Sequence, residues 1–341
     1  MAKILITGGA GYIGSHTAIS LHEAGYTPVI IDSFENSDPS VLDGLRRITG
    51  QDIPCYEGDC NDRVLMDKIF REHQLEGVIH FAAYKAVGES TEKPLAYYRN
   101  NLGSLIVLLE VMQEHGVKDL VFSSSCTVYG QPETNPVSET TPRKEAESPY
   151  GNTKRISEDI LRDLIASKAP LRIIALRYFN PVGAHPSGAI GELPRGVPNN
   201  LVPFVTQTGA GLREELTVFG DDYNTPDGSC IRDYIHVMDL AEAHVKSITY
   251  AHRQQAPFLD LFNVGTGHGN SVLEVIKAFE KVSGRQLNYR IGKRRPGDVE
   301  QVWASTEKVG KVLGWQARFS LEDALRDAWN WQQQLTPEAK D

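Results

Sequence analysis

The chain has 341 residues, more than a typical single domain, so we expect one large and one smaller domain. Its net charge is −9, from 35 basic and 44 acidic residues, which argues against nucleic acid or an anionic membrane surface as a partner. The sequence shows neither a run of 18 apolar residues nor a charged-then-apolar leader, so we expect a cytoplasmic protein that does not span a membrane.

The cysteines and histidines favour neither a disulfide framework nor a metal site. Cys55, Cys60, Cys126 and Cys230 show no CxxC spacing, and we interpret them as reduced thiols of a cytosolic protein. The ten histidines form no HExxH motif, so we expect no bound metal.

Short apolar runs alternate with segments of helical apolar spacing along the first half of the chain. The runs are residues 4–7, 28–31, 53–56, 77–81, 120–123 and 172–176, and the helical segments are 13–24, 63–73, 95–115 and 153–165. This alternation predicts βαβ units and a doubly wound parallel sheet, an α/β Rossmann-like fold.

The composition of the sequence and the length of its predicted elements change after Asn180. A Gly/Pro-rich stretch, "NPVGAHPSGAIGELPRGVPNN", is followed by shorter elements that include helical segments at 237–250 and 272–282. We predict a first domain over residues 1–180, with segments near 232–265 returning to it, and a smaller α/β substrate-binding domain over 181–341. A cleft between the two would hold the ligands.

Glycines crowd the junction of the first strand and first helix in "KILITGGAGYIGSHTA". Gly8, Gly11 and Gly14 permit a tight turn and let the backbone approach a bulky anion, and the helix that starts near Gly11 would point its N–H groups at a pyrophosphate. Asp32 ends the second strand, where a carboxylate accepts hydrogen bonds from a ribose diol and repels a 2′-phosphate. The pattern predicts NAD binding in the first domain, and its alternative is a purely structural turn.

Tyr150 and Lys154 stand four residues apart in "SPYGNTKRISEDIL", at the start of a predicted helix, so both side chains lie on one face. A phenol titrates near pKa ~10, and a base at neutral pH needs that pKa lowered by about 3 units. A neighbouring ammonium and a nicotinamide cation supply charge of the right sign. Tyr289 and Lys293 repeat the spacing on a strand-like segment, and we interpret that pair as structural.

A strand-like run upstream of Tyr150 ends in serines, "LVFSSSCTVYG". Ser125 would lie at the carboxyl end of a parallel strand, the edge where such sheets bind ligands, although serines also cap helices and turns. With the glycine turn and Asp32, these residues predict hydride-transfer machinery. Ser125 and Tyr150 would share a substrate hydroxyl, and Lys154 would bind the nicotinamide ribose.

These motifs resemble those of the extended short-chain dehydrogenase/reductases, and among them the UDP-glucose (UDP-galactose) 4-epimerase family. The resemblance runs almost end to end. It rests on "TGGAGYIGSH", "HFAAYKAVGES", "SSSCTVYG", "SPYGNTK", "RYFNPVGAHPSG", "PNNLVPF", "FGDDYNTPDGSCIRDYIHVMDLA", "FNVGTG" and "RRPGDVEQVWA".

The resemblance implies two sets of ligand contacts. Around NAD, beside the glycines, Tyr150 and Lys154, it places Tyr12, Ile13, Asp32, Asn36, Ser37, Asp59, Cys60, Phe81, Ala82, Ala83, Lys85, Asn100 and Phe179. Around a UDP-sugar, beside Ser125, Tyr150 and Lys85, it places Asn180, Asn200, Leu201, Phe219, Arg232, Arg295, Asp298 and Val302. A diphosphate bound to an acidic protein needs cationic groups close by. The guanidinium groups of Arg232 and Arg295 could supply them.

The activity implied by the resemblance is redox-neutral C4 epimerisation of UDP-hexoses. Tyr150 would take the C4 hydroxyl proton, hydride would pass to a retained NAD, and the 4-keto sugar would turn over before hydride returns. A homodimer pairing the helices around 95–115 and 153–165 is also implied, and its alternative is a monomer that buries the same apolar face.

Two positions depart from the commoner family pattern. Cys126 stands where Ala is usual, and Val302 stands where many bacterial members carry Tyr. A smaller side chain at 302 would admit N-acetyl sugars if it lines the sugar pocket, and the alternative is that Val302 is a core strand residue.

Two rival functions differ in the residues they need. A nucleotide-sugar 4,6-dehydratase or decarboxylase needs an acid/base pair, and the dehydratases place carboxylates just before "VYG", where this chain has Cys126 and Thr127. A regulator that senses a dinucleotide without chemistry would not need Ser125, Tyr150 and Lys154 together.

Overall fold

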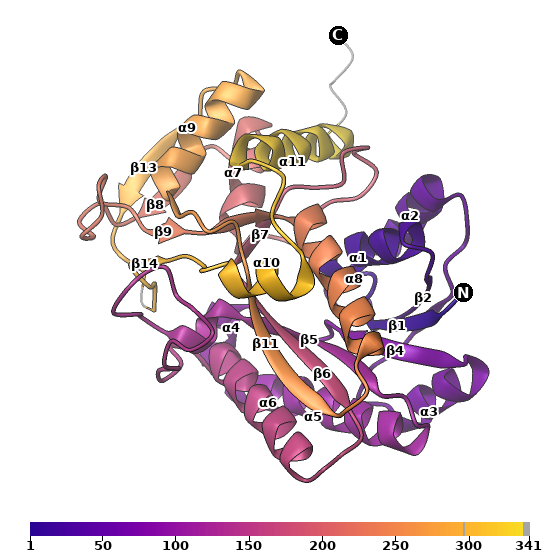
Figure 1. Ribbon diagram of the computed structural model, residues 1–341. Helices are drawn as coiled ribbons and strands as arrows, with labels where there is room; N and C mark the ends of the chain where they lie inside the picture. The colour runs from indigo at the N-terminus through magenta and orange to yellow at the C-terminus, as the bar shows by residue number, and fades with distance from the viewer. Residues whose placement is uncertain (296, 337–341) are drawn as a thin grey trace.

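Short hydrophobic runs form the strands of a central parallel sheet (Figure 1). Its strands are β1 (Lys3–Thr7), β2 (Thr27–Asp32), β3 (Cys55–Glu57), β4 (Leu75–His80), β5 (Asp119–Ser125), β6 (Arg172–Tyr178) and β11 (Phe258–Val264). In the computed structural model, which describes residues 1–295 and 297–336, these seven strands have the order β11-β6-β5-β4-β1-β2-β3. The order reverses between β1 and β4, and ligands of such sheets bind outside the carboxyl ends of the strands at that point.

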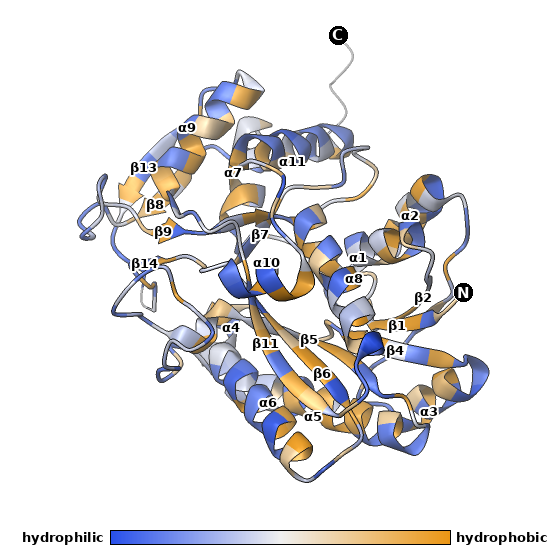
Figure 2. Cartoon of the chain, viewed as in Figure 1, coloured by the Kyte–Doolittle hydropathy of each residue, from blue (hydrophilic) through white to orange (hydrophobic). Residues whose placement is uncertain are grey.

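Helices cover both faces of the sheet because alternate strand residues point to opposite sides. Ile4 and Ile6 pack on one face with α1 (Tyr12–Glu23), α2 (Val41–Thr49), α8 (Val237–Arg253) and α10 (Glu307–Leu313). Leu5 packs on the other face with α3 (Arg63–Glu72), α5 (Pro94–Glu114) and α6 (Pro149–Ala166). Figure 2 shows largely hydrophobic strands between helices of mixed character. The predicted doubly wound α/β fold is confirmed.

A second hydrophobic core lies outside the sheet. It joins α7 (Leu201–Gly209), α9 (Val272–Ser283), α11 (Leu321–Leu335) and β8 (Leu216–Phe219). β8 pairs with β13 (Tyr289–Gly292), and Figure 1 shows this group gathered at one end of the molecule. None of the helices within the described residues is long and apolar enough to cross a membrane.

Smaller elements complete the fold. They are α4 (Val87–Glu92), the 3-10 helix η1 (Cys126–Tyr129), β7 (Asn180–Val182) paired with β10 (Tyr234–His236), and β9 (Ile231–Arg232) between β12 (Asn270–Ser271) and β14 (Gln301–Val302). The division into two domains stays a prediction. Residues 337–341 of the second predicted domain, and residue 296 of the "RRPGD" motif, lie outside the described residues.

Helix α6 begins four residues earlier than its apolar spacing predicts. The Ser148 side chain caps it by accepting a hydrogen bond from Gly151 N, and Pro149 occupies the first turn, where its missing N–H costs nothing. Tyr150 and Lys154 therefore both lie within regular helix, on one face.

Candidate functional site

The glycine turn between β1 and α1 is too tight for side chains at Gly8, Gly9 and Gly14. Gly8 has φ +69°, and a Cβ there would lie 2.9 Å from Ala82 N. A Cβ on Gly14 would lie 2.3 Å from the carbonyl oxygen of Gly8. Gly11, the N-cap of α1, has no side chain to occupy the helix N-terminus. The turn thus presents backbone and the positive end of a helix dipole to the reversal point of the sheet.

Asp32, the last residue of β2, is joined directly to this turn. Its Oδ2 accepts a hydrogen bond from Ala10 N at 2.9 Å, and its Oδ1 accepts from Ser37 Oγ at 2.8 Å. Asn36 lies exposed in the same loop. The carboxylate is therefore fixed beside the glycine turn, as expected for a group that binds a ribose diol.

The loops after β3 and β4 bring further predicted residues to the same edge. Asn61 donates to Asp59 at 2.9 Å and to Asn100 at 3.3 Å, which joins these two predicted contacts. Phe81 N donates to Thr7 O, so Phe81, Ala82 and Ala83 follow the edge of β1. The Cys60 side chain packs into the core beneath the sheet, which leaves only its backbone for a ligand.

Ser125, Tyr150 and Lys154 converge where β5 meets the N-terminal turns of α6. Lys154 Nζ donates to the carbonyl oxygen of Ser123 at 2.7 Å and lies 6.0 Å from the centroid of the Tyr150 ring. Ser125 caps η1 by accepting from Thr127 N at 3.2 Å. The three side chains predicted to act together thus occupy one place at the carboxyl edge of the sheet.

Burial controls the protonation of this group. It raises the pKa of the Tyr150 phenol to about 12, against a hydrogen bond from Ser125 that lowers it, and it lowers the pKa of the Lys154 ammonium to about 7. From the four-residue spacing we expected the Lys154 ammonium to lower the pKa of the phenol. In the fold, loss of solvation around the phenolate is the largest effect on this pKa, and Lys154 is not among the groups that lower it.

Glu192, which the sequence analysis missed, links two predicted ligand contacts. Its carboxylate accepts from Asn200 Nδ2 at 2.7 Å and lies 3.5 Å from Lys85 Nζ. Lys85 follows β4, whereas Asn200 immediately precedes Leu201, the first residue of α7. No local pattern marks Glu192, because Lys85 lies 107 residues away and the eight-residue interval to Asn200 lies outside any helix or strand.

A cluster of charges gathers around Asp298. Arg295 Nη2 lies 2.8 Å from Asp298 Oδ1, and Arg232 Nη2 lies 3.9 Å from the same oxygen. The Arg295 guanidinium also lies 5.6 Å from the centroid of the half-exposed Phe219 ring. Two cations beside an aromatic face can bind a phosphate and a flat base.

The buried carboxylate of Asp233 holds the strands of this cluster together. It accepts from Thr266 N at 2.8 Å, Gly267 N at 3.1 Å and Ala304 N at 3.1 Å. These bonds fix β9 against β14, in the register that places Arg232 opposite Val302.

Val302 is only 4% exposed and packs with Phe179 and with the partly buried Cys126, next to Ser125. Asn180 follows Phe179 and donates its N–H to Asp233 O at 2.9 Å. Tyr12 and Ile13 lie in the first turn of α1, where the Tyr12 hydroxyl donates to Gly183 O at 2.7 Å. The predicted contacts therefore include one group at the glycine turn, one that Glu192 joins and one around Arg232.

Comparison with known proteins matches this chain over nearly its whole length. A family model described as GDP-mannose 4,6 dehydratase matches residues 5–328. The UDP-glucose 4-epimerase of Bacillus subtilis (strain 168) is 52% identical over 329 residues, 96% of each chain.

Solved structures show the same similarity. A UDP-glucose 4-epimerase from Bifidobacterium longum in complex with NAD+ and UDP has a TM-score of 0.94 and 47% identity, covering 98% of this chain and 99% of that chain. One from Stenotrophomonas maltophila with bound NAD and formylated UDP-arabinopyranose has a TM-score of 0.95, with the same identity and coverage.

Proposed function

Because the chain belongs to the UDP-glucose 4-epimerases, isomerases of the extended short-chain dehydrogenase/reductases, we propose that it interconverts UDP-glucose and UDP-galactose through a transient 4-keto sugar. The observation that carries this proposal is the convergence of Ser125, Tyr150 and Lys154 beside the glycine turn. The description of the matching family model raises the dehydratase alternative. Cys126 and Thr127 stand where that chemistry needs carboxylates, and burial raises the pKa of the Cys126 thiol to about 12.

We infer that NAD is the cofactor. The residues at the glycine turn fit this cofactor. Side chains at Gly8 and Gly14 would fill the space that the turn leaves for a pyrophosphate, and Asp32 is fixed beside the turn, where it could bind a ribose diol. The two solved relatives contain NAD or NAD+. When bound, this group supplies a hydride acceptor and a positive charge.

Side chains of this chain would carry out the proton transfers. Tyr150 would accept the proton of the sugar's C4 hydroxyl, Ser125 would orient that hydroxyl, and Lys154 would stabilise the phenolate. Since burial is the largest effect on the phenol's pKa and raises it, the phenolate would require the positive charge that the Lys154 ammonium and the cofactor supply.

The substrate is inferred to be a UDP-sugar bound between Asn200 and the cluster around Asp298. Arg232 and Arg295 would take the diphosphate, and Phe219 would stack on the base. On binding, the diphosphate would replace Asp298 as the partner of one or both guanidinium groups.

We further infer a cytoplasmic homodimer. The four cysteines of the chain, all within the described residues, are unpaired, as is usual in a reducing compartment. Helix α5 packs against α6 and exposes Leu95 and Ile106, which an interface between copies through these helices would cover.

Val302 is proposed to admit N-acetyl sugars beside the plain ones. We expect Val302→Tyr to lower kcat/KM for UDP-N-acetylglucosamine roughly tenfold or more beyond its effect on UDP-glucose, because the ring would occupy the space of the N-acetyl group. The measurement is the product spectrum and kcat/KM of both proteins with UDP-glucose, UDP-galactose and their N-acetyl counterparts.

The plain sugars are the internal control of this experiment. Val302 is buried, so a tyrosine also strains the cluster around Phe179, and that effect lowers all four activities together. Equal losses on plain and N-acetyl sugars, or a wild type without N-acetyl activity, would refute the proposed breadth. A wild type that converts neither plain sugar would refute the function itself.

A further inference from the structure

A buried ion pair lies two helical turns beyond Tyr150. Glu158 of α6 is 0% exposed and Arg177 of β6 is 2% exposed. The contact is bidentate, with Arg177 Nε donating to Glu158 Oε1 at 2.8 Å and Nη2 donating to Oε2 at 2.6 Å. Such a fork fixes orientation as well as distance.

Glu158 lies on the same face of α6 as the catalytic pair. Tyr150, Lys154 and Glu158 follow one another at intervals of four residues, so the three side chains form one row about 12 Å long on the helix. Glu158 Oε1 also accepts from Ser124 Oγ at 2.7 Å, and Ser124 immediately precedes Ser125 in β5. The carboxylate therefore fixes the register of α6 against the strand that carries Ser125.

The guanidinium also binds the turn that follows Ser125. Arg177 Nη1 donates to the Tyr129 hydroxyl at 3.0 Å and to the carbonyl oxygen of Glu139 at 3.4 Å. Tyr129 ends η1, the helix that Ser125 caps, and its hydroxyl donates to Asn263 Oδ1 at 2.6 Å. One guanidinium thus joins the helix that bears Tyr150 to the turn that follows Ser125.

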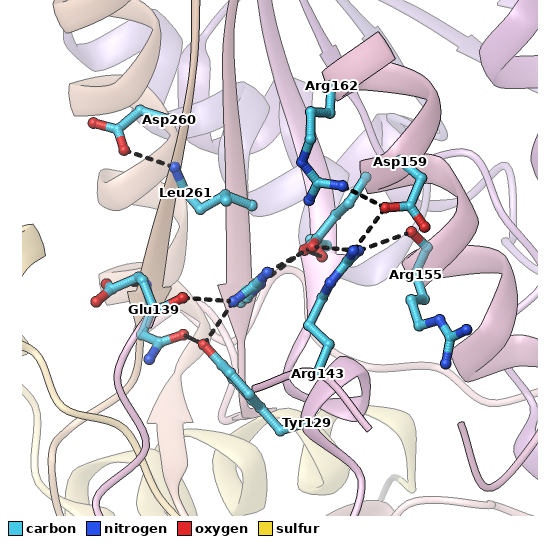
Figure 3. Close-up of polar contacts among 12 residues, drawn as sticks. Tyr129, Glu139, Arg143, Arg155, Asp159, Arg162, Asp260 and Leu261 are labelled. Atoms are coloured by element: carbon cyan, nitrogen blue, oxygen red, sulfur yellow. Dashed lines mark hydrogen bonds and ion pairs between the residues drawn. The ribbon is translucent and has the colours of Figure 1, made fainter. Parts of the chain in front are cut away.

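Arg143 makes further contacts with Glu158 and with its neighbour Asp159. Arg143 Nη2 donates to Asp159 Oδ1 at 2.7 Å, and Arg143 Nη1 lies 3.5 Å from Glu158 Oε2. Figure 3 shows Tyr129 and Glu139 on one side of this network and Arg143 and Asp159 on the other. The network spans β5, β6 and α6 beneath the catalytic group, and its central charges are satisfied on several sides.

We propose that Glu158 and Arg177 are positioning residues for proton transfer, which hold Tyr150 and Ser125 at the separation that sharing one substrate hydroxyl requires. This inference rests on the proposed epimerase function. A displacement of about 1 Å in such a pair costs on the order of 100-fold in rate, so loss of the fork acts on turnover and spares ligand binding, which uses other residues.

The test is Glu158→Gln, which keeps the size of the side chain and removes its charge. We expect kcat for UDP-glucose to fall roughly 10- to 100-fold, with KM within about threefold of the wild type and bound NAD per chain unchanged. Glu158→Gln leaves a buried guanidinium without its charged partner and can fail to fold. The double variant Glu158→Leu/Arg177→Met leaves no unpaired charge, and the same fall in kcat is expected.

Asp119→Asn is the matched control. Arg172 Nε donates to the buried carboxylate of Asp119, and these two residues begin the same strands, β6 and β5. They lie about 20 Å from Ser125 along β5, at the amino ends of the strands, whereas the site lies at the carboxyl ends. This variant is expected to lose thermal stability yet keep kcat within about twofold.

The outcomes separate a positioning role from a structural one. The proposal is supported if a folded, NAD-loaded Glu158→Gln or double variant loses kcat at constant KM and Asp119→Asn does not. It is overturned if either folded variant keeps kcat within twofold of the wild type, or if Asp119→Asn loses as much. A wild type that makes no UDP-galactose refutes the epimerase function instead, which is a distinct result.

Discussion

We expect Tyr150→Phe to lower kcat for UDP-glucose epimerisation by at least about 100-fold, the usual contribution of a positioned general base. Phenylalanine preserves the ring, which packs near Lys154, and removes only the hydroxyl that would accept the proton. Fold and bound NAD should stay close to those of the wild type. Steady-state kinetics, circular dichroism and the NAD content of the purified protein measure the three quantities.

Tyr289→Phe is the control, because Tyr289 and Lys293 repeat the sequence spacing of Tyr150 and Lys154. Tyr289 begins strand β13 and is 41% exposed, and the extended backbone of a strand sets residues four apart about 13 Å from each other, against about 6 Å along a helix. This variant should keep kcat within about twofold. Turnover close to wild type in Tyr150→Phe would remove Tyr150 from the mechanism.

The second large effect is expected at the glycine turn, where Gly14→Ala should lower the NAD bound per chain roughly tenfold or more, equivalent to about 1.4 kcal/mol of binding. The added Cβ would lie 2.3 Å from Gly8 O and 2.8 Å from Gly9 Cα, both backbone atoms that cannot rotate away. The turn must open, which moves the N-terminus of α1 out of place. Extraction and quantification of the nucleotide measure this loss.

Gly310→Ala in α10 is the control that separates the steric clash at Gly14 from the general effect of replacing a helical glycine with alanine. Alanine is favoured over glycine within helices by about 1 kcal/mol, so substitution of either glycine would otherwise stabilise the protein. A Cβ on Gly310 meets only ordinary contact, at 3.6 Å from Trp315 O. We expect full NAD content and equal or higher thermal stability for Gly310→Ala. A Gly14→Ala protein that retains NAD like the wild type would refute the role assigned to the turn.

Much of this fold is visible in the sequence because its signals are local. Apolar runs and helical spacing mark the central sheet and its larger helices, and the glycines with Asp32 mark the dinucleotide edge. Helix α2 was missed although Val41, Leu45 and Ile48 have helical apolar spacing and pack on the sheet, because its nine residues form barely two turns.

The parts of the site that were missed depend on contacts between distant segments. Glu158 meets Arg177 of another element, and Glu192 meets Lys85 from 107 residues away, so no sequence spacing connects either pair. The raised pKa of Tyr150 is another such property, since burial follows from packing of the whole site and not from the four-residue interval to Lys154. The residue types were enough to predict the kind of chemistry. The pKa values of these groups and their long-range contacts could be read only from the fold.

The central claim is that hydride leaves C4 of the sugar and returns to it within one site. UDP-glucose carrying deuterium at C4 tests it directly, with mass spectrometry of the UDP-galactose formed and absorbance of the solution at the wavelength of NADH. We predict that deuterium stays at C4 of the product and that NADH does not accumulate. Loss of the deuterium to solvent, or NADH released in proportion to the sugar consumed, would contradict the claim.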